Sequence, residues 1–252
     1  MENDLVSIVT PMYNGERFVA QTIDSVLAQS YSRWEMLIVD DGSKDNSPAL
    51  VGKYAQQDAR IKLIRQPNGG SASARNNALR HAQGRYICFL DADDLWEPDF
   101  LEKQLKFLQE KNAGIVYASY RRINETGVEI LRPFIVPDKV NYKGLLKTCS
   151  ISCLTALFDK TKTGEAFFNE ALKSMRDDFA FWLSLLKRVD YAYGNLEVLA
   201  SYRVFSTSTT GNKKKVMKPQ FLVYRDVEKL GLIKSVYYFI HWAINGFFKY
   251  RS

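Results

Sequence analysis

Residues 87–94 read ICFLDADD, an apolar run that ends in three carboxylates within four positions. A buried strand does not carry that much negative charge at its tip unless something positive offsets it, and a metal ion is the expected partner. Asp91 and Asp93 stand two apart, so in extended backbone both carboxylates face one side. Such a pair can join Mg²⁺ or Mn²⁺ to a nucleotide diphosphate, and the alternative is a solvated turn. We expect Asp94 to cap the following helix.

Apolar strand-like runs alternate with helix-like segments over the first 110 residues. The predicted strands cover 6–10, 36–40, 61–65 and 86–90. The predicted helices cover 18–29, 47–57, 71–82 and 98–110. Four such units predict an α/β fold with a Rossmann-like, mostly parallel central sheet flanked by helices. Ligands of such sheets bind beyond the carboxyl ends of the strands.

The second half is less regular. The patterns predict strands over 114–123, 128–135 and 152–158, and a helix with a bulky apolar face over 179–188. The lysine run Lys213–Lys215 follows a Thr-Thr-Gly-Asn stretch and predicts a hinge or flexible loop.

Charge is concentrated at one end of the 252-residue chain. The net charge is +7, but residues 201–252 carry 10 Lys/Arg against 2 Asp/Glu, so the first 200 residues are close to neutral. This distribution favours an enzyme with a surface-seeking tail over a nucleic-acid binder. Three cysteines without zinc spacing and no visible leader favour a cytoplasmic location. No apolar window is long enough to predict a spanning helix.

Polar residues follow the predicted strands, where ligands are expected. They are Pro11, Tyr13 and Asn14 after the first strand, and Asp40 and Asp41 after the second. A carboxylate at the end of the second strand can accept hydrogen bonds from ribose hydroxyls or a base N–H. The alternative is an Asp-Gly turn with a solvated Asp41.

The segment 68–77, NGGSASARNN, opens the helix after the third strand. Its small residues allow close backbone approach, the helix N-terminus favours an anion, and Arg75 can reach a phosphate or a base edge. The segment lacks the P-loop pattern and the dinucleotide fingerprint. Asp177 and Asp178 open a later helix, either as caps or with one of them as a general base.

Five segments in this order resemble the family 2 glycosyltransferases of GT-A fold. They are VSIVTPMYNGERFVAQTIDSVLAQSY, WEMLIVDDGSKDNS, RQPNGGSASARNNAL, GRYICFLDADDLWEPDFLEKQL and FFNEALKSMRDDFAFWLSL, and the resemblance covers residues 4 to about 205. It implies that a nucleoside, usually uridine, is held by Pro11, Tyr13, Asn14 and Asp40, with Asp41 in support.

The resemblance also implies roles for the charged residues. Arg75 would lie near the base or diphosphate, Asp91 at the ribose or the metal, and Asp93 on the metal. Counting back from the tryptophan of the helix, Asp177 takes the place of the family's glutamate, and Asp178 that of the aspartate that acts as base.

Two departures from the family pattern bear on function. Many members carry Tyr-Arg-x-His after this helix, with the histidine near the metal, whereas this chain reads YRVFSTS with Phe205 in that place. Metal ligation from this segment is therefore in question, and Ser206 or Ser208 could touch phosphate instead. The Gln-x-x-Arg-Trp signature of processive members is absent, which favours a single sugar addition.

The resemblance implies an inverting transferase that moves one sugar from a nucleotide-diphosphate sugar, in the family usually a UDP-sugar, to a hydroxyl of a carbohydrate or lipid-linked acceptor. Mn²⁺ or Mg²⁺ would assist, and the pathway would be polysaccharide or glycolipid synthesis. Two alternatives remain open. One is a degenerate sugar-nucleotide-binding subunit, and the other is a nucleotidyltransferase, whose usual lysine-containing glycine-rich loop is replaced here by PMYNGERF.

The same reasoning divides the chain. We expect a catalytic domain over 1–210, with a nucleotide-sugar half over 1–112 and an acceptor half over 113–210, followed by a basic helical tail over 211–252. Apolar residues recur at helical spacing within 232–252. This helix either contacts an anionic membrane surface, which would make the protein peripheral on the inner face of the membrane, or packs on its own domain.

Overall fold

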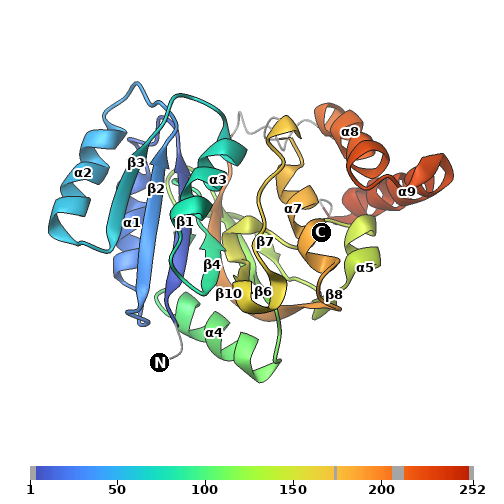
Figure 1. Ribbon diagram of the computed structural model, residues 1–252, viewed down its shortest axis with the longest axis horizontal. Helices are drawn as coiled ribbons and strands as arrows, with labels where there is room; N and C mark the ends of the chain where they lie inside the picture. The colour runs from blue at the N-terminus through green and yellow to red at the C-terminus, as the bar shows by residue number, and fades with distance from the viewer. Residues whose placement is uncertain (1–3, 173–174, 206–212, 250–252) are drawn as a thin grey trace.

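The computed structural model describes residues 4–172, 175–205 and 213–249, and ten strands of this part form one sheet (Figure 1). The strands are β1 (Val6–Met12), β2 (Trp34–Asp40), β3 (Ile61–Arg65), β4 (Tyr86–Phe89), β5 (Leu95–Trp96), β6 (Ile115–Ile123), β7 (Glu129–Phe134), β8 (Lys139–Val140), β9 (Leu157–Asp159) and β10 (Ala192–Arg203). The longest strand path runs β3-β2-β1-β4-β9-β6-β10-β5.

The helices flank this sheet on both faces. They are α1 (Val19–Leu27), α2 (Ser47–Gln57), α3 (Ser71–His81), α4 (Phe100–Glu110), α5 (Tyr142–Lys147), α6 (Lys160–Thr163), α7 (Asp177–Leu186), α8 (Lys213–Leu222) and α9 (Gly231–Lys249), with a π-helical turn η4 (Val223–Val227) between the last two.

The first four strands are parallel, as predicted. β1 lies between β2 and β4, with Val9 opposite Leu37 on one side and Phe89 on the other. The chain therefore builds outward from β1 in both directions, and the strand order reverses between β1 and β4. Beyond β4 the sheet is mixed, because β9 is antiparallel to both of its neighbours while β10 runs parallel to β6.

Alternating side chains of the central strands fill two apolar cores, one on each face of the sheet. Residues such as Ile8, Ile38 and Cys88 pack with α1, α2 and α4. Their neighbours, such as Leu37 and Phe89, pack with α3, α5 and α7. The doubly covered sheet holds the strand ends in fixed positions, which is what a site built there requires.

Helices α8 and α9 lie at one end of the molecule, with α2 at the other (Figure 1). Helix α9 packs on its own domain. Its Tyr238 ring lies 6.3 Å from that of Tyr224, and Asn245 donates a hydrogen bond of 3.0 Å to the carbonyl of Lys147 in α5. The opposite side of α9 stays open, since Ile233 is 87% exposed. None of the helices in the described part of the chain is long and apolar enough to cross a membrane.

The structure differs from the sequence predictions at three places in the second half of the chain. Segment 152–158 is not one strand, because a 3₁₀ turn covers Cys153–Thr155 before β9 begins at Leu157. The lysine run 213–215 begins helix α8 rather than forming a loop. Strand β10 was missed, because register shifts near Asn195 and Val198 interrupt the alternation that marks a strand.

Candidate active site

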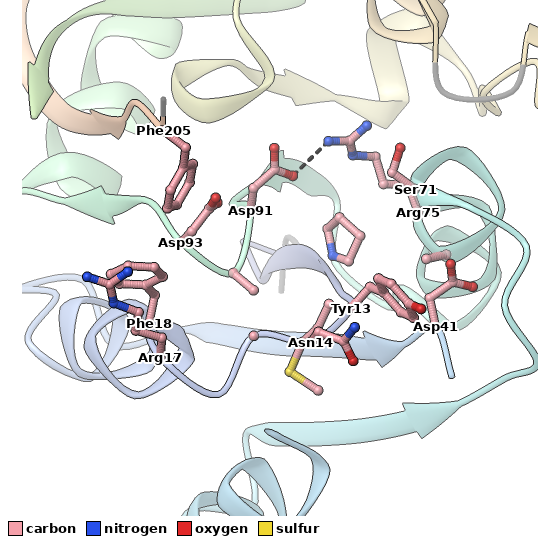
Figure 2. A pocket seen from close by; sticks show the side chains of 15 residues that line it. Tyr13, Asn14, Arg17, Phe18, Asp41, Ser71, Arg75, Asp91, Asp93 and Phe205 are labelled. Carbon is pink, nitrogen blue, oxygen red and sulfur yellow. Dashed lines mark hydrogen bonds and ion pairs between the residues drawn. The ribbon is translucent and has the colours of Figure 1, made fainter. Parts of the chain in front are cut away.

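A cleft of about 500 Å³ opens at the carboxyl ends of β1 and β4, where the strand order reverses. Open α/β sheets bind ligands at this topological switch point, and the volume suits a nucleotide-sized ligand. The lining residues are Pro11, Met12, Tyr13, Asn14, Gly15, Arg17, Phe18, Asp41, Ser71, Ala74, Arg75, Asp91, Ala92, Asp93 and Phe205. Figure 2 shows Tyr13, Asp41 and Ser71 toward one end and Phe18, Asp93 and Phe205 toward the other.

Tyr13 and Asn14 follow β1, and Pro11 lies at the carboxyl end of that strand; all three line the cleft, as expected. The Tyr13 side chain is 51% exposed, so its ring face is open to a planar ligand. Asn14 has a positive φ of 52°, and its side-chain oxygen accepts a hydrogen bond of 2.9 Å from the backbone N–H of Lys44. This bond ties the loop after β1 to the loop after β2.

The two aspartates at the carboxyl end of β2, Asp40 as its last residue and Asp41 just after it, make different contacts. Asp40 is buried, accepts a hydrogen bond from the Ser43 backbone N–H at 2.9 Å, and does not line the cleft. Asp41 lines the cleft and accepts hydrogen bonds of 2.8 Å from the backbone N–H groups of Gly69 and Gly70. The structure therefore brings Asp41 to the cleft wall and gives Asp40 a turn-forming contact.

Arg75 joins the cleft to the start of helix α7. Its guanidinium lies 2.7 Å from Asp91 and 3.5 Å from Asp177, and the arginine and Asp177 are both buried (Figure 2 shows the Asp91 contact). Burial is the largest single influence and would lower the pKa of Arg75, but the surrounding groups, with the Asp91 charge first among them and that of Asp177 included, together outweigh it and raise the pKa above its ordinary value. The arginine therefore stays charged between two carboxylates from distant segments.

Asp177 and Asp178 occupy the first turn of α7, as predicted. Burial and the neighbouring charge of Asp178 raise the pKa of Asp177. Asp177 pairs with Arg75. Asp178 is half-buried and does not take part in that ion pair. Neither aspartate lines the cleft itself. Ser206 and Ser208, the predicted phosphate contacts, lie outside the described residues.

The chemistry of Asp91 and Asp93 fits a divalent cation. Burial, with the charge of Asp91 added, raises the pKa of Asp93 to about 6, so the protein by itself disfavours two ionised carboxylates here. A bound cation would reverse that, and hard cations prefer carboxylate oxygens. No cluster of three or more His, Cys, Asp or Glu side chains able to hold a metal occurs within residues 4–172, 175–205 and 213–249.

Asp94 does not cap the next helix, contrary to our expectation. Helix α4 begins only at Phe100, and the Asp94 carboxylate instead accepts a hydrogen bond of 2.8 Å from the backbone N–H of Arg203. Burial and the charges of Asp93 and Asp91 raise the pKa of Asp94 well above its ordinary value. The third acid of the opening motif is thus a structural partner of β10.

Several residues that line the cleft were not predicted from the sequence. Ser71, Arg17 and Phe18 line the cleft, and the Phe18 ring lies 5.5 Å from that of Phe205. Ser71 and Arg17 were inside segments already singled out, so proximity in sequence could have found them. The Phe18 to Phe205 contact spans almost the whole catalytic region and has no local signal.

The sequence and the fold can now be compared with known proteins. The family model "Glycosyl transferase family 2" matches residues 7–176. The chain belongs to glycosyl transferase family 2. It is 40% identical over 243 residues to the putative teichuronic acid biosynthesis glycosyltransferase TuaG of Bacillus subtilis, with 96% of each chain covered. It is 37% identical over 252 residues to the UDP-Glc:alpha-D-GlcNAc-diphosphoundecaprenol beta-1,3-glucosyltransferase WfgD of Escherichia coli, with 99% of this chain and 96% of WfgD covered. This family 2 chain is therefore a glycosyltransferase.

Solved structures share its fold. TarS 1–349 of S. aureus in complex with UDP-GlcNAc aligns with a TM-score of 0.70 at 19% identity, over 88% of this chain and 66% of TarS 1–349. The mannosyltransferase PcManGT of Pyrobaculum calidifontis, in complex with GDP-Man and Mn²⁺, aligns with a TM-score of 0.68 at 20% identity, over 91% of this chain and 65% of PcManGT. The predicted GT-A fold of this family 2 chain is confirmed.

Proposed function

We propose that this family 2 enzyme transfers one sugar from a nucleotide-diphosphate sugar, a UDP-sugar in the first instance, to a hydroxyl of a lipid-linked or polysaccharide acceptor, with inversion at the anomeric carbon. The observation that carries the proposal is the cleft at the β1/β4 switch point, where Tyr13, Asp41, Arg75 and the Asp91–Asp93 pair converge. TarS with UDP-GlcNAc and WfgD, whose name gives UDP-Glc as donor, support this choice of donor class.

Each end of the cleft has a part in this proposal. The open Tyr13 ring stacks on the base, and Pro11, Asn14 and Asp41 hold the nucleoside, with Asp40 supporting them through the turn that it forms with Ser43. Asp93 and Asp91 hold Mn²⁺ or Mg²⁺, which when bound neutralises charge on the departing diphosphate. Arg75 adds a fixed positive charge beside Asp91. Ser206 and Ser208 remain candidates for phosphate contact, outside the described residues.

Asp178 acts as the general base in this proposal. It takes the proton of the acceptor hydroxyl, the hydroxyl oxygen forms a bond to the anomeric carbon, and the bond from that carbon to the diphosphate oxygen breaks. Asp177 cannot take this part as readily, because it faces Arg75. The Arg75 contact also fixes the first turn of α7 relative to the cleft, which supports placing Asp178 near the acceptor.

The proposed acceptor and the open side of α9 together indicate where in the cell we propose that the protein works. Residues 1–210 form the catalytic unit, with halves at 1–112 and 113–210, and residues 211–252 form a tail that contacts the membrane surface through the open side of α9. The name of WfgD specifies a diphosphoundecaprenol acceptor, which supports a lipid-linked acceptor here and a peripheral position on the cytoplasmic face of the membrane. Cell-surface polysaccharide synthesis is the pathway class that TuaG and WfgD support.

Two single substitutions test the proposal. Asp178→Asn should lower kcat by about 10³-fold or more, because a base is lost, while UDP binding in Mn²⁺ stays near wild type. Asp93→Asn should lower transfer as much and also weaken Mn²⁺-dependent UDP binding about 10- to 100-fold. Transfer is measured as UDP release from candidate UDP-sugars, and binding by isothermal titration calorimetry.

Asp99→Asn is the matched control, because Asp99 is a partly exposed aspartate on the same segment whose side chain pairs with Lys103 at 2.8 Å. It should leave both measurements unchanged. Near wild-type turnover by Asp178→Asn would reject the base assignment, and unchanged UDP binding by Asp93→Asn would reject the metal assignment.

A further inference from the structure

Arg203 lies behind the Asp-x-Asp segment, buried at the end of β10 with only 2% of its surface exposed. Its backbone N–H donates to the Asp94 carboxylate at 2.8 Å, and its side-chain Nε donates to the Asp93 carbonyl at 2.8 Å. One residue therefore holds two consecutive members of the acidic cluster, one through the backbone and one through the side chain.

The rest of the Arg203 guanidinium binds two other segments that border the cleft. Nη2 donates to the Gln21 side-chain oxygen in α1 at 2.9 Å, and Nη1 donates to the carbonyl of Glu125 after β6 at 3.1 Å. The Arg203 side chain thus joins β10 to three segments that are far apart in sequence. Such a fork of donors needs a guanidinium, because a lysine ammonium cannot reach acceptors in these separate directions.

Arg203 also supports the aromatic wall of the cleft. Its guanidinium carbon lies 4.4 Å from the centre of the Phe18 ring, and Phe18 contacts Phe205 with ring centres 5.5 Å apart. Figure 2 shows Phe18 and Phe205 on either side of Asp93. The wall and the acid beside it are therefore fixed by the same buried cation.

We propose that Arg203 is a positioning residue for the diphosphate end of the donor site. It fixes the Asp93–Asp94 backbone, and with it the Asp93 carboxylate, against the Phe18–Phe205 wall. The proposal rests on the proposed function in one respect, since the ligand whose binding it sets is the cation-bound diphosphate of a nucleotide. Arg203 makes no contact with the Tyr13 and Asp41 end, so the nucleoside end does not depend on it.

Two variants test the role, Arg203→Lys and Arg203→Met. The lysine keeps the charge but loses the fork, so we expect it to weaken UDP binding in the presence of Mn²⁺ about 10-fold or more. UDP binding in EDTA should change less than about twofold, because the nucleoside end is unaltered. Arg203→Met should show the larger loss, and both are measured by isothermal titration calorimetry.

Arg85→Met is the matched control. Arg85 is a mostly buried arginine that pairs with buried Asp159 at 2.7 Å, just before β4 and thus at the far end of that strand from the cleft. Its loss should lower the thermal midpoint as much as that of Arg203, because a buried charge is left without its partner, yet leave Mn²⁺-dependent UDP binding within about twofold.

The outcomes separate the two proposals. A Mn²⁺-specific loss in Arg203→Lys that is absent from Arg85→Met supports the positioning role. Wild-type affinity in Arg203→Lys, or an equal loss with Mn²⁺ and in EDTA, overturns it while leaving the proposed function in place. If the wild-type protein binds neither UDP nor GDP in Mn²⁺, the donor site itself is rejected, and the role of Arg203 with it.

Discussion

Arg75 is the residue on which the charge balance of the cleft depends. It reaches Asp91 after β4 and Asp177 at the start of α7. Arg75 and Asp177 are buried, so the loss of either leaves a buried charge without its partner, whereas the Asp91 side chain is 39% exposed in the cleft and can be solvated.

Arg75→Met should lower the free energy of unfolding by about 3–5 kcal/mol, because it leaves the buried Asp177 carboxylate without its cation. Urea denaturation at pH 7 measures this. Adding Asp177→Asn to Arg75→Met should restore part of the loss, since one uncompensated charge is removed. A cost below about 1 kcal/mol for Arg75→Met would contradict the buried ion-pair assignment.

The sequence predicted single residues well where the backbone rule was simple. Pro11, Tyr13, Asn14 and Asp91 lie at or just after the carboxyl ends of strands, and they do line the cleft. The sequence could not show which of Asp40 and Asp41 reaches the cleft, because that depends on the backbone conformation of the turn after β2. Nor could it assign Asp94, whose partner Arg203 lies 109 residues away. The functional roles of these residues stay predictions.

At the scale of elements, the parallel strands β1, β2 and β3 are joined at their starting ends by Glu35. Its carboxylate accepts hydrogen bonds from Ser7 of β1 at 2.7 Å, from Lys62 of β3 at 2.8 Å, and from the Gln83 backbone N–H at 2.7 Å. Burial raises the pKa of Glu35, but these bonds outweigh it and hold the pKa below its ordinary value.

Glu35→Gln should therefore destabilise the protein in a pH-dependent way. A lowered pKa in the folded state means that Glu35 stabilises the fold above its unfolded pKa of about 4.3 and loses this effect as the pH falls through the folded value. The variant should cost about 1–3 kcal/mol at pH 7 and progressively less below pH ~4. Urea titrations at several pH values measure the difference, with exposed Glu110→Gln as control. A difference that grows as the pH falls would contradict the assignment.

Elements were predicted best where periodicity was regular. Helix α2 and strand β3 begin and end where the pattern says they do. The second half was harder for two physical reasons. Strands such as β5 and β8 are two residues long and carry no period, and β10 has shifts in register that break its alternation. Antiparallel pairing of β9 between β4 and β6 depends on contacts distant in sequence, which no local pattern encodes.

At the scale of the whole molecule, α9 has two apolar sides with different surroundings. Its aromatic side packs on α5 and η4, through Tyr238 and its neighbours. Its aliphatic side carries Leu232, Ile233, Val236, Ile240 and Ile244, which are 60%, 87%, 41%, 51% and 49% exposed. Because the chain is also most basic in this region, an anionic lipid surface is the partner that we propose for this side of the helix.

Replacing Ile233, Ile240 and Ile244 together by Asn should reduce co-sedimentation with phosphatidylglycerol vesicles several-fold, because exposed apolar area is lost without disturbing the packed side. Added salt should weaken wild-type binding, since part of the attraction is electrostatic. Substitution is preferable to removal of 232–252, which would uncover the core beneath α9.

The control replaces Val128, Ile130 and Leu131, exposed apolar residues in or next to β7, by Asn. This variant should sediment like the wild type. Unchanged binding by the α9 variant, or an equal loss in the control, would count against a membrane-facing role for α9.

Because Arg75 pairs with two aspartates from distant segments, it limits how the sequence can diverge during evolution. Arg75 and Asp91 belong to the segment of the first four strands, while Asp177 belongs to the later segment. A lineage that lost Arg75 would leave Asp177 buried without a cation, and one that lost either aspartate would leave the buried arginine with one carboxylate instead of two, so a single change is penalised before a second can compensate. We expect these three positions to be inherited together, whereas the exposed positions around the acceptor side can drift toward new substrates.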